Sequence, residues 1–259
     1  MWRRLQLNSP IADWRGRRVW LVGASTGIGE ALAKALHQRE AKVIVSARKV
    51  DVLNALCKDY PGMLAKPLDV TDADAVTKVA SEIERDTGLD VVVFCAGYYK
   101  PMRAAAWSGE ECRRHWEVNV QGWWHVLDVV LPVVRARGQG HLCAISSVAG
   151  YRALPKALAY GPTKAALSHL MQGLYIDLRG EGIGVSLVNP GFVSTPLTAQ
   201  NDFKMPALIS PDEAAREILA GWAKGSFEIH FPKRFTLIMK ALSYLPWRWY
   251  FSLMRRVDA

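Results

Sequence analysis

The sequence has few of the residue patterns on which metal, redox or disulfide chemistry depends. Its 259 residues include four cysteines, and no two of them form a Cys-x-x-Cys pair. The six histidines show no His-x-x-x-His spacing, which would place two ligands on one helix face. We therefore expect no metal site and interpret the cysteines as free thiols in a reducing compartment. Cys95 and Cys143 lie in apolar stretches and are expected to be small core residues.

Signals for secretion, membrane insertion and domain division are also missing. The first ten residues contain no apolar core of a secretory signal, which predicts a cytoplasmic protein. The apolar run 235–254 is long enough to span a bilayer, but Lys240, Pro246 and Arg248 interrupt it. No linker rich in proline, glycine or serine and no internal repeat divides the chain. Because 50% of the residues are hydrophobic, the sequence predicts one domain with one large core.

Excess charge is absent from the body of the chain, although the net charge is +9. Residues 19–232 contain 22 basic and 22 acidic side chains, so no basic face there predicts nucleic-acid binding. Residues 1–18 and 233–259 carry +4 and +5. We interpret these ends as additions to a neutral body. The predicted organisation is a basic N-terminal extension over 1–16, a single domain over 17–232, and a basic, aromatic C-terminal segment over 233–259.

A glycine-rich loop is the first informative feature that the sequence does contain. The apolar stretch Arg18–Val22 is followed by Gly23-Ala-Ser-Thr-Gly27-Ile-Gly29 and then by a segment with helical periodicity. Strand, glycine turn and helix in this order form the phosphate-binding unit of dinucleotide folds. Gly23 permits the tight turn, Gly27 lets the backbone approach a pyrophosphate, and Gly29 lets the helix pack on the strand. The loop predicts a dinucleotide cofactor.

The second informative feature is a segment from Ser147 to Lys164 that combines a hydroxyl, a phenol and an ammonium. Tyr160 and Lys164 are four residues apart, and a helix over Ala157–Arg179 would place them on one face. The ammonium would then favour the phenolate and bring the tyrosine pKa towards the working range. Ser147 follows the expected strand Leu142–Ser146, at the sheet edge where ligands bind. Taken alone, Tyr-x-x-x-Lys is also typical of two solvated helix residues.

Together, these motifs make the sequence resemble the short-chain dehydrogenase/reductase family over about residues 17–231. The resemblance is carried, in the family's order and spacing, by Gly23-x-x-x-Gly27-x-Gly29, Asp69, Asn119, Ser147, Tyr160, Lys164 and Pro190-Gly191. Val22 and Phe94-Cys95 depart from it, since the family has Thr and Asn-Asn there. The resemblance implies an α/β, single-domain Rossmann fold, with a doubly wound seven-stranded parallel sheet and helices on both faces. It also implies binding of NAD(H) or NADP(H) and interconversion of alcohols and carbonyls.

The pattern of apolar stretches supports the same fold independently. Apolar stretches alternate with helix-like stretches, as is typical of parallel βαβ units. The expected strands are Val19–Val22, Lys42–Ala47, Met63–Leu68, Val91–Cys95, Leu142–Ser146, Val185–Val188 and Phe227–Phe231.

The resemblance also implies roles for individual residues. It implies that Ser147 and Tyr160 hydrogen-bond the substrate carbonyl and that Tyr160 transfers the proton. Lys164 would lower the Tyr160 pKa and contact the nicotinamide ribose. Asn119 would hold a water that continues the proton path, although a lone helical asparagine is usually inert. The expected cofactor-binding residues are Gly23, Ser25, Thr26, Gly27, Ile28, Gly29, Arg48, Asp69, Val70, Ala96, Gly97, Tyr160, Lys164, Pro190, Gly191, Val193 and Thr195.

The end of the second expected strand, Val45-Ser-Ala-Arg48-Lys49, indicates the cofactor preference. A carboxylate at this place would bind the ribose 2′-hydroxyl of NAD(H), whereas a 2′-phosphate requires a cation. No acid is present, and the planar guanidinium of Arg48 suits a phosphate. The sequence therefore predicts a preference for NADP(H), with NAD(H) as the alternative. Two other interpretations stay open: a solvated Arg48-Lys49 pair, and Asp69 as a helix N-cap instead of an adenine contact.

Apolar surfaces leave the partners of the protein open. We expect the segment 233–259 to pack on a neighbouring subunit or to wall the substrate pocket, with contact to the inner face of a membrane as the alternative. The apolar loop Pro196–Ile209 indicates a hydrophobic carbonyl or alcohol as substrate. A non-catalytic cofactor-sensing or membrane-surface protein on the same fold is the alternative function. Apolar residues at helical spacing around Asn119 form a stripe that is expected to lie in the core or in the interface of a homodimer or homotetramer. The stripe consists of Trp116, Val120, Trp123, Trp124 and Leu127.

Overall fold

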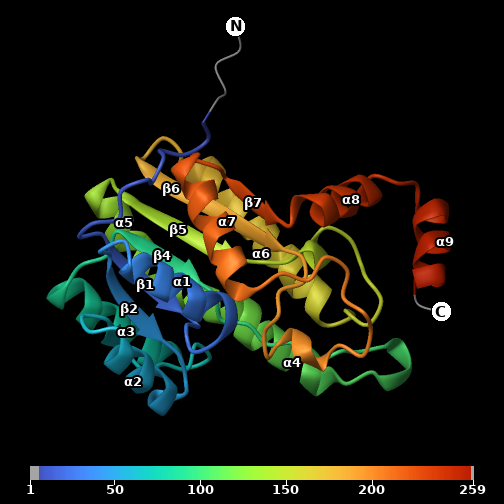
Figure 1. Cartoon of the computed structure of the whole chain (residues 1–259), viewed down its shortest axis with the longest axis horizontal. Helices are drawn as coiled ribbons and strands as arrows, with labels where there is room; N and C mark the ends of the chain where they lie inside the picture. Colours follow the sequence, from blue (N-terminus) through green and yellow to red (C-terminus); the bar gives the residue numbers. More distant parts are fainter. Residues whose placement is uncertain (1–5, 258–259) are drawn as a thin grey trace, which may run out of the picture.

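The chain forms one seven-stranded parallel sheet with helices on both faces, as predicted (Figure 1). The computed structural model describes residues 6–257. All neighbouring strands run parallel in the order β3-β2-β1-β4-β5-β6-β7. The order reverses between β1 and β4, and in such sheets ligands bind at the carboxyl ends of these two strands. The strands are β1 (Arg18–Val22), β2 (Lys42–Ser46), β3 (Leu64–Ala65), β4 (Val91–Phe94), β5 (Gly140–Ile145), β6 (Ile183–Pro190) and β7 (Glu228–Phe231).

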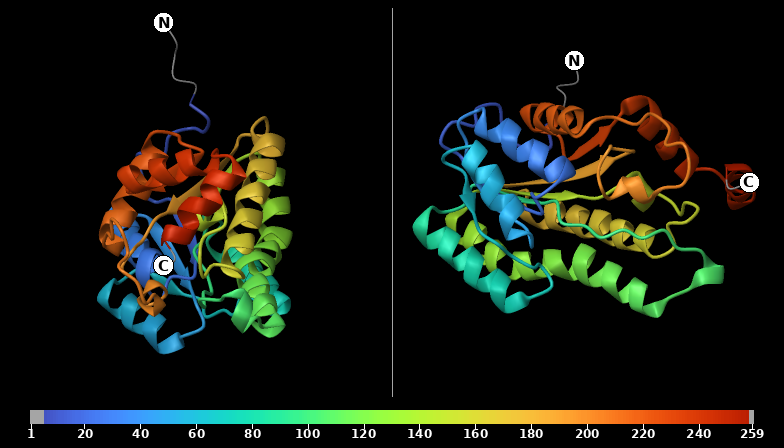
Figure 2. Two further views of the ribbon diagram at one scale, coloured as in Figure 1. Left: turned by 90° about the vertical axis from the view of Figure 1, so that its right-hand side faces the viewer. Right: turned by 60° about the horizontal axis from the view of Figure 1, so that its bottom comes forward.

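Each face of the sheet has its own hydrophobic core, because successive strand residues point to opposite sides. Val19 and Leu21 of β1 belong to one core, whereas Trp20 and Val22 belong to the other. Both views in Figure 2 show the sheet between two layers of helices. The first core is covered by α1 (Gly27–His37), α2 (Val50–Asp59) and α7 (Pro211–Ala223). The second is covered by α3 (Ala73–Asp86), α5 (Gly122–Arg137) and α6 (Tyr160–Leu178).

The predicted strands differ from the observed ones by one or two residues at their ends, and two elements differ by three residues at one end. The third strand covers Leu64–Ala65 instead of Met63–Leu68, although backbone hydrogen bonds from Lys66 and Leu68 to β2 and Ala47 continue beyond it. Helix α6 begins at Tyr160 instead of Ala157. The chain before α6 is still turning, since Lys156 has a left-handed φ of 59°. The tyrosine is therefore the first residue of its helix.

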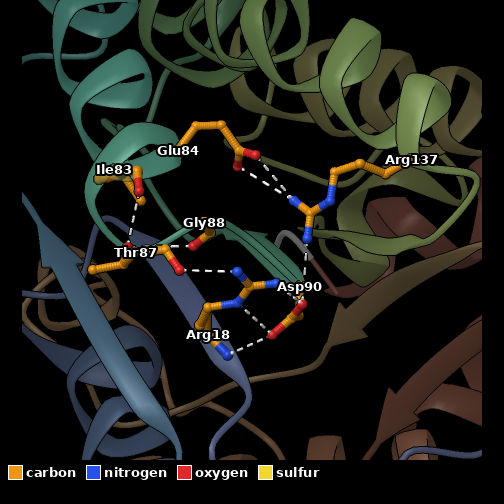
Figure 3. Close-up of polar contacts among 7 residues, drawn as sticks. All are labelled: Arg18, Ile83, Glu84, Thr87, Gly88, Asp90 and Arg137. Carbon is orange, nitrogen blue, oxygen red and sulfur yellow. Dashed lines mark hydrogen bonds and ion pairs between the residues drawn. The ribbon is translucent and has the colours of Figure 1, made fainter.

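An ion-pair cluster joins β1 to β4 at their amino ends, opposite the expected ligand site (Figure 3). The Arg18 Nε donates to Asp90 Oδ2 at 2.9 Å, and its Nη1 donates to the Thr87 carbonyl at 2.9 Å. Arg137 Nη1 lies 3.3 Å from Glu84, and Nη2 lies 3.6 Å from Asp90. Burial raises the pKa of Asp90, but its hydrogen bonds with Arg18 outweigh burial and leave it below its usual value. The cluster therefore holds β1 and β4 together at the end of the sheet opposite the expected ligand site.

Helices α8 (Lys233–Ser243) and α9 (Trp247–Val257) lie outside the two layers, in red in Figure 1. Helix α8 starts two residues after β7 ends, so both helices follow the carboxyl end of the sheet. Figure 2 shows α9 standing beyond the rest of the chain. No helix among residues 6–257 is long and apolar enough to cross a bilayer.

Candidate active site

A cavity of about 1040 Å³ lies at the carboxyl ends of the strands. Every predicted cofactor-binding residue lines it, and so do Ser147, Tyr160 and Lys164. Asn119 does not line the cavity, because its side chain is fully buried behind it. The fold thus brings together residues from the glycine loop, from the ends of β2, β4, β5 and β6, and from α6.

The glycine loop, which we call the glycine cradle, is packed against backbone too closely for side chains. Gly23 has a φ of 96°, and a Cβ there would lie 2.3 Å from the backbone nitrogen of Ala96. A Cβ at Gly29 would lie 2.3 Å from the Gly23 carbonyl oxygen. Thr26, the N-cap of α1, makes no side-chain cap hydrogen bond, so the first N–H groups of α1 have no side-chain acceptor there. A close backbone approach and a helix N-terminus fit the pyrophosphate of a dinucleotide.

Two cations and one carboxylate line the part of the cavity beside β2 and α3. Arg48 and Lys49 are exposed at the end of β2. Asp69 Oδ1 accepts hydrogen bonds from the Thr71 backbone and hydroxyl at 3.0 and 2.8 Å. The N-cap of α3 is Asp72, so the interpretation of Asp69 as an N-cap was wrong. Asp69 therefore stays a predicted adenine contact.

A short turn packs closely against α6 and brings Ser147 near Tyr160 and Lys164. Ser147 precedes the 3₁₀ turn Val148–Gly150, where its Oγ accepts from the Ala149 N–H at 3.1 Å. A Cβ at Gly150 would lie 2.8 Å from the carbonyl carbon of Lys164. Only glycine lets the turn approach the helix this closely, and this approach brings the serine to the start of α6.

The electrostatics of the tyrosine differ from the prediction. Burial raises the pKa of Tyr160, and a hydrogen bond with Ser147 only partly opposes it. Burial also lowers the pKa of Lys164 to about 8. The Lys164 Nζ donates to the Ile145 carbonyl at 2.9 Å and lies 5.4 Å from the centre of the Tyr160 ring. The net pKa of Tyr160 therefore lies above its usual value, opposite to the predicted direction, because burial outweighs the groups that favour the phenolate. Near pH 7 the phenol is protonated and the lysine is charged.

Asn119 lies in a π-helical turn, Glu117–Gln121, between α4 (Gly109–Trp116) and α5. Its Nδ2 donates to the Tyr98 carbonyl and to Thr163 Oγ1, both at 3.0 Å. Its Oδ1 accepts from the Tyr98 N–H at 2.7 Å. The side chain therefore ties the loop after β4 to the residue that precedes Lys164. One acceptor site of Oδ1 remains for a water, and that role stays a prediction.

An apolar wall completes the cavity, and its C-terminal part is one of the two placements predicted for residues 233–259. The Tyr99 ring packs edge-on against the Tyr160 ring, with ring centres 5.0 Å apart. The C-terminal segment forms this wall. In α8 the apolar residues recur three and four positions apart, a spacing that indicates a helix with one apolar face. The contributing residues are Phe235, Ile238, Met239, Leu242, Leu253 and Met254.

Arg152 joins the loop between Ser147 and Tyr160 to the C-terminal helices. Its Nη1 donates to the carbonyls of Leu242, Ser243 and Leu245 at 3.2, 3.1 and 2.6 Å. Its guanidinium lies 4.0 Å from the ring centre of Trp247 and 4.1 Å from that of Tyr250. The loop between Ser147 and Tyr160 therefore holds the wall in place.

Replacing Arg152 by alanine should loosen the wall and raise the KM for an apolar substrate about tenfold. The reason is the loss of charge-assisted hydrogen bonds and two cation–π contacts, together about 1.5–3 kcal/mol. Binding of the predicted dinucleotide should change less than about twofold, because Arg152 does not line the cavity. Steady-state kinetics and fluorescence titration measure both. Arg152→Lys keeps the charge but lacks the planar guanidinium, so its KM should lie between those of the unchanged chain and the alanine variant. An unchanged KM in the alanine variant would refute this role.

Comparisons with known proteins agree with this geometry. The family model described as short chain dehydrogenase matches residues 17–205. An uncharacterized oxidoreductase of Myxococcus xanthus is 36% identical over 241 residues, which cover 91% of this chain and 95% of the relative. A solved short-chain dehydrogenase from Streptomyces avermitilis is 26% identical with a TM-score of 0.78, covering 87% of this chain and 92% of that one. A short-chain dehydrogenase from Sphingobium yanoikuyae in complex with NADPH shares the fold, with a TM-score of 0.77, 23% identity, and 89% and 97% coverage.

Proposed function

The chain belongs to the short-chain dehydrogenase family and is an oxidoreductase, and we propose that it transfers a hydride between NADP(H) and a hydrophobic carbonyl or alcohol substrate. One observation carries this proposal. Ser147, Tyr160 and Lys164 line the same cavity as a glycine cradle and an apolar wall. A reacting carbonyl bound between cradle and wall would contact the proton-transfer groups. We place this activity in the cytoplasm.

The preference for NADP(H) is supported by the residues beside the end of β2. Arg48 and Lys49 line the cavity there, and residues 47–49, directly after the strand, contain no acid. A structural neighbour with the same fold was solved with NADPH. NAD(H) stays the alternative cofactor. When bound, the dinucleotide supplies the hydride, with its pyrophosphate on the Gly23–Gly29 loop and its adenine beside Asp69 and Val70.

The chain's own residues supply the proton and the charge stabilisation. In the reduction direction, Ser147 and Tyr160 donate hydrogen bonds to the substrate carbonyl oxygen. Tyr160 is protonated at neutral pH, because burial raises its pKa, and it gives its proton to the developing alkoxide. The ammonium of Lys164 then stabilises the phenolate that remains. General acid catalysis of this kind contributes about 10²–10⁴-fold.

Lys164 sets the expected pH dependence. Because its pKa is about 8, the ammonium is present at pH 7 and is lost as the pH rises through 8. Burial raises the pKa of the neighbouring Cys95 thiol to about 12, so this thiol stays neutral in that range. We expect kcat/KM for carbonyl reduction to be level below about pH 7 and to fall about tenfold per unit above about pH 8. A profile that stays level to about pH 10 would contradict the role of Lys164.

A cofactor and substrate panel tests the proposed function. Consumption of NADPH and of NADH is followed with hydrophobic ketones, aldehydes and acyl derivatives. We expect turnover of at least one apolar carbonyl, faster with NADPH than with NADH. Cofactor binding without turnover of any compound would instead support a non-catalytic cofactor-sensing protein.

We propose in addition that the protein is a homodimer or homotetramer. The predicted stripe on α4 and α5 divides in the structure. Val120, Trp123 and Leu127 are buried in the core. Trp116 and Trp124 are 38% and 42% exposed and pack edge-on, with ring centres 6.3 Å apart. These two tryptophans are the part of the stripe available to a second subunit.

A further inference from the structure

The outer face of α8 and α9 exposes large apolar side chains that no part of the described chain covers. Helix α8 lines the cavity with Phe235, Ile238 and Met239, and Leu237 and Ile238 are also 55% and 58% exposed. Aromatic residues continue this exposed face, with Tyr244, Trp247, Trp249 and Phe251 between 52% and 87% exposed. We call these six exposed residues and the five exposed cations that accompany them the α8–α9 surface. The cations are Lys233, Arg234, Arg248, Arg255 and Arg256.

Two of the exposed aromatic residues, Trp247 and Phe251, are held in place by contacts with neighbouring side chains. Tyr250, on the opposite side of α9, is 1% exposed and donates to the Ala153 carbonyl at 2.6 Å. Arg152 stacks on Trp247, and Phe251 stacks on the same ring with ring centres 5.4 Å apart. The fold therefore fixes α9 with its aromatic flanks in solvent. Large exposed apolar patches of this kind mark interaction sites.

Charge decides which partner the α8–α9 surface fits. Residues 233–257 contain six lysines and arginines and no acid. Lys240 is already paired with Glu228, and the other five are exposed. In a symmetric dimer through this surface, the cations of one copy would meet those of the other. An anionic bilayer complements the surface, because Trp and Tyr favour the acyl boundary and Lys and Arg favour the head groups.

We propose that the α8–α9 surface binds an anionic lipid bilayer and presents the mouth of the cavity to it. Ile238 carries the geometric link, because it both lines the cavity and is more than half exposed. Leu242, Leu253 and Met254 continue the cavity wall from the same two helices. An apolar substrate dissolved in the bilayer can therefore reach Tyr160 along this wall. This substrate route rests on the proposed function, whereas the lipid contact does not.

Vesicle binding by the full chain tests the lipid contact. We expect sedimentation with vesicles of phosphatidylcholine and phosphatidylglycerol, and little with phosphatidylcholine alone. Raising the salt from about 0.05 to about 0.5 M should weaken the binding about tenfold or more, because the attraction is screened. Sedimentation that is equal for both lipids, or absent for both, would overturn the proposal.

Paired variants separate the surface from general charge effects. Arg248→Glu with Arg255→Glu should reduce sedimentation at least about tenfold. The matched control, Arg39→Glu with Lys58→Glu, reverses two exposed charges near the ends of α1 and α2, at the amino edge of the sheet, and should bind as the unchanged chain does. Retained NADPH affinity shows that each variant is folded. An equal loss in both pairs, or an altered oligomer without vesicle binding, would overturn the proposal.

Turnover distinguishes this inference from the proposed reaction. Vesicle binding is measured without substrate, so its failure leaves the reaction untouched. Vesicle binding with no turnover on any carbonyl would count against the reaction alone. If both hold, the unchanged chain should reduce a vesicle-dissolved ketone faster than the Arg248→Glu, Arg255→Glu variant does, with equal rates on a water-soluble ketone. Equal rates on both ketones would refute the substrate route.

Discussion

Replacing Tyr160 by phenylalanine should lower the turnover of carbonyl reduction by at least about 10²-fold, whereas NADPH binding should survive with a loss of less than about tenfold. The substitution removes the hydroxyl that donates the proton and keeps the ring. The ring contacts with Tyr99 and His115, whose ring centres lie 5.0 and 6.5 Å away, are retained. Single-turnover kinetics and a fluorescence titration of NADPH measure the two quantities.

Tyr99 offers a matched control, because it is a second tyrosine of the same cavity. Its hydroxyl donates to Asn201 Oδ1 at 2.9 Å and so has a structural partner. Tyr99→Phe should therefore lower turnover by less than about tenfold, the scale of one lost hydrogen bond. If Tyr160→Phe retained full activity, or if both variants lost activity equally, Tyr160 would not be the proton donor.

The sequence predicted the parts of the fold that depend on local pattern. Alternating apolar stretches predicted the parallel sheet, which the structure confirms, and the loop from Gly23 to Gly29 predicted a phosphate site that lines the cavity. The spacing of Ser147, Tyr160 and Lys164 placed all three on one cavity. The glycine loop and the spacing of the three side chains are short motifs within one part of the sequence. The alternation of apolar and helix-like stretches is repeated along the chain. Both kinds of pattern can be recognised without knowing which distant segments pack together.

Features that depend on packing between distant segments were not predictable. The pKa of Tyr160 follows its burial by residues far away in the chain, so a helical spacing of four could not give its direction. The contact of Arg152 with the carbonyl of Leu245 joins positions 93 residues apart. Strand β3 has two residues, too few for an apolar pattern to predict where it ends. Helix α6 begins later than predicted because Lys156 adopts a left-handed backbone conformation.

Replacing Arg48 by alanine should weaken NADPH binding by about 1.5–3 kcal/mol, or roughly 10- to 150-fold, and change NADH binding less than about twofold. The side chain is exposed on the cavity wall, where its guanidinium can hold a 2′-phosphate through paired hydrogen bonds. NADH has no such phosphate. Titration of both cofactors against both proteins measures the difference.

The neighbouring cation and a reversed charge complete this experiment. Lys49 also lines the cavity beside β2, but its ammonium cannot form the paired hydrogen bonds of a guanidinium. Lys49→Ala should therefore weaken NADPH binding only severalfold. Arg48→Asp should go further than alanine, because a carboxylate repels the 2′-phosphate and accepts a hydrogen bond from the 2′-hydroxyl of NADH. The preference should then reverse towards NADH. A parallel loss of both cofactors in the alanine variant would instead show that Arg48 supports the loop between β2 and α2, and the basis of NADP(H) preference would have to lie elsewhere on the wall.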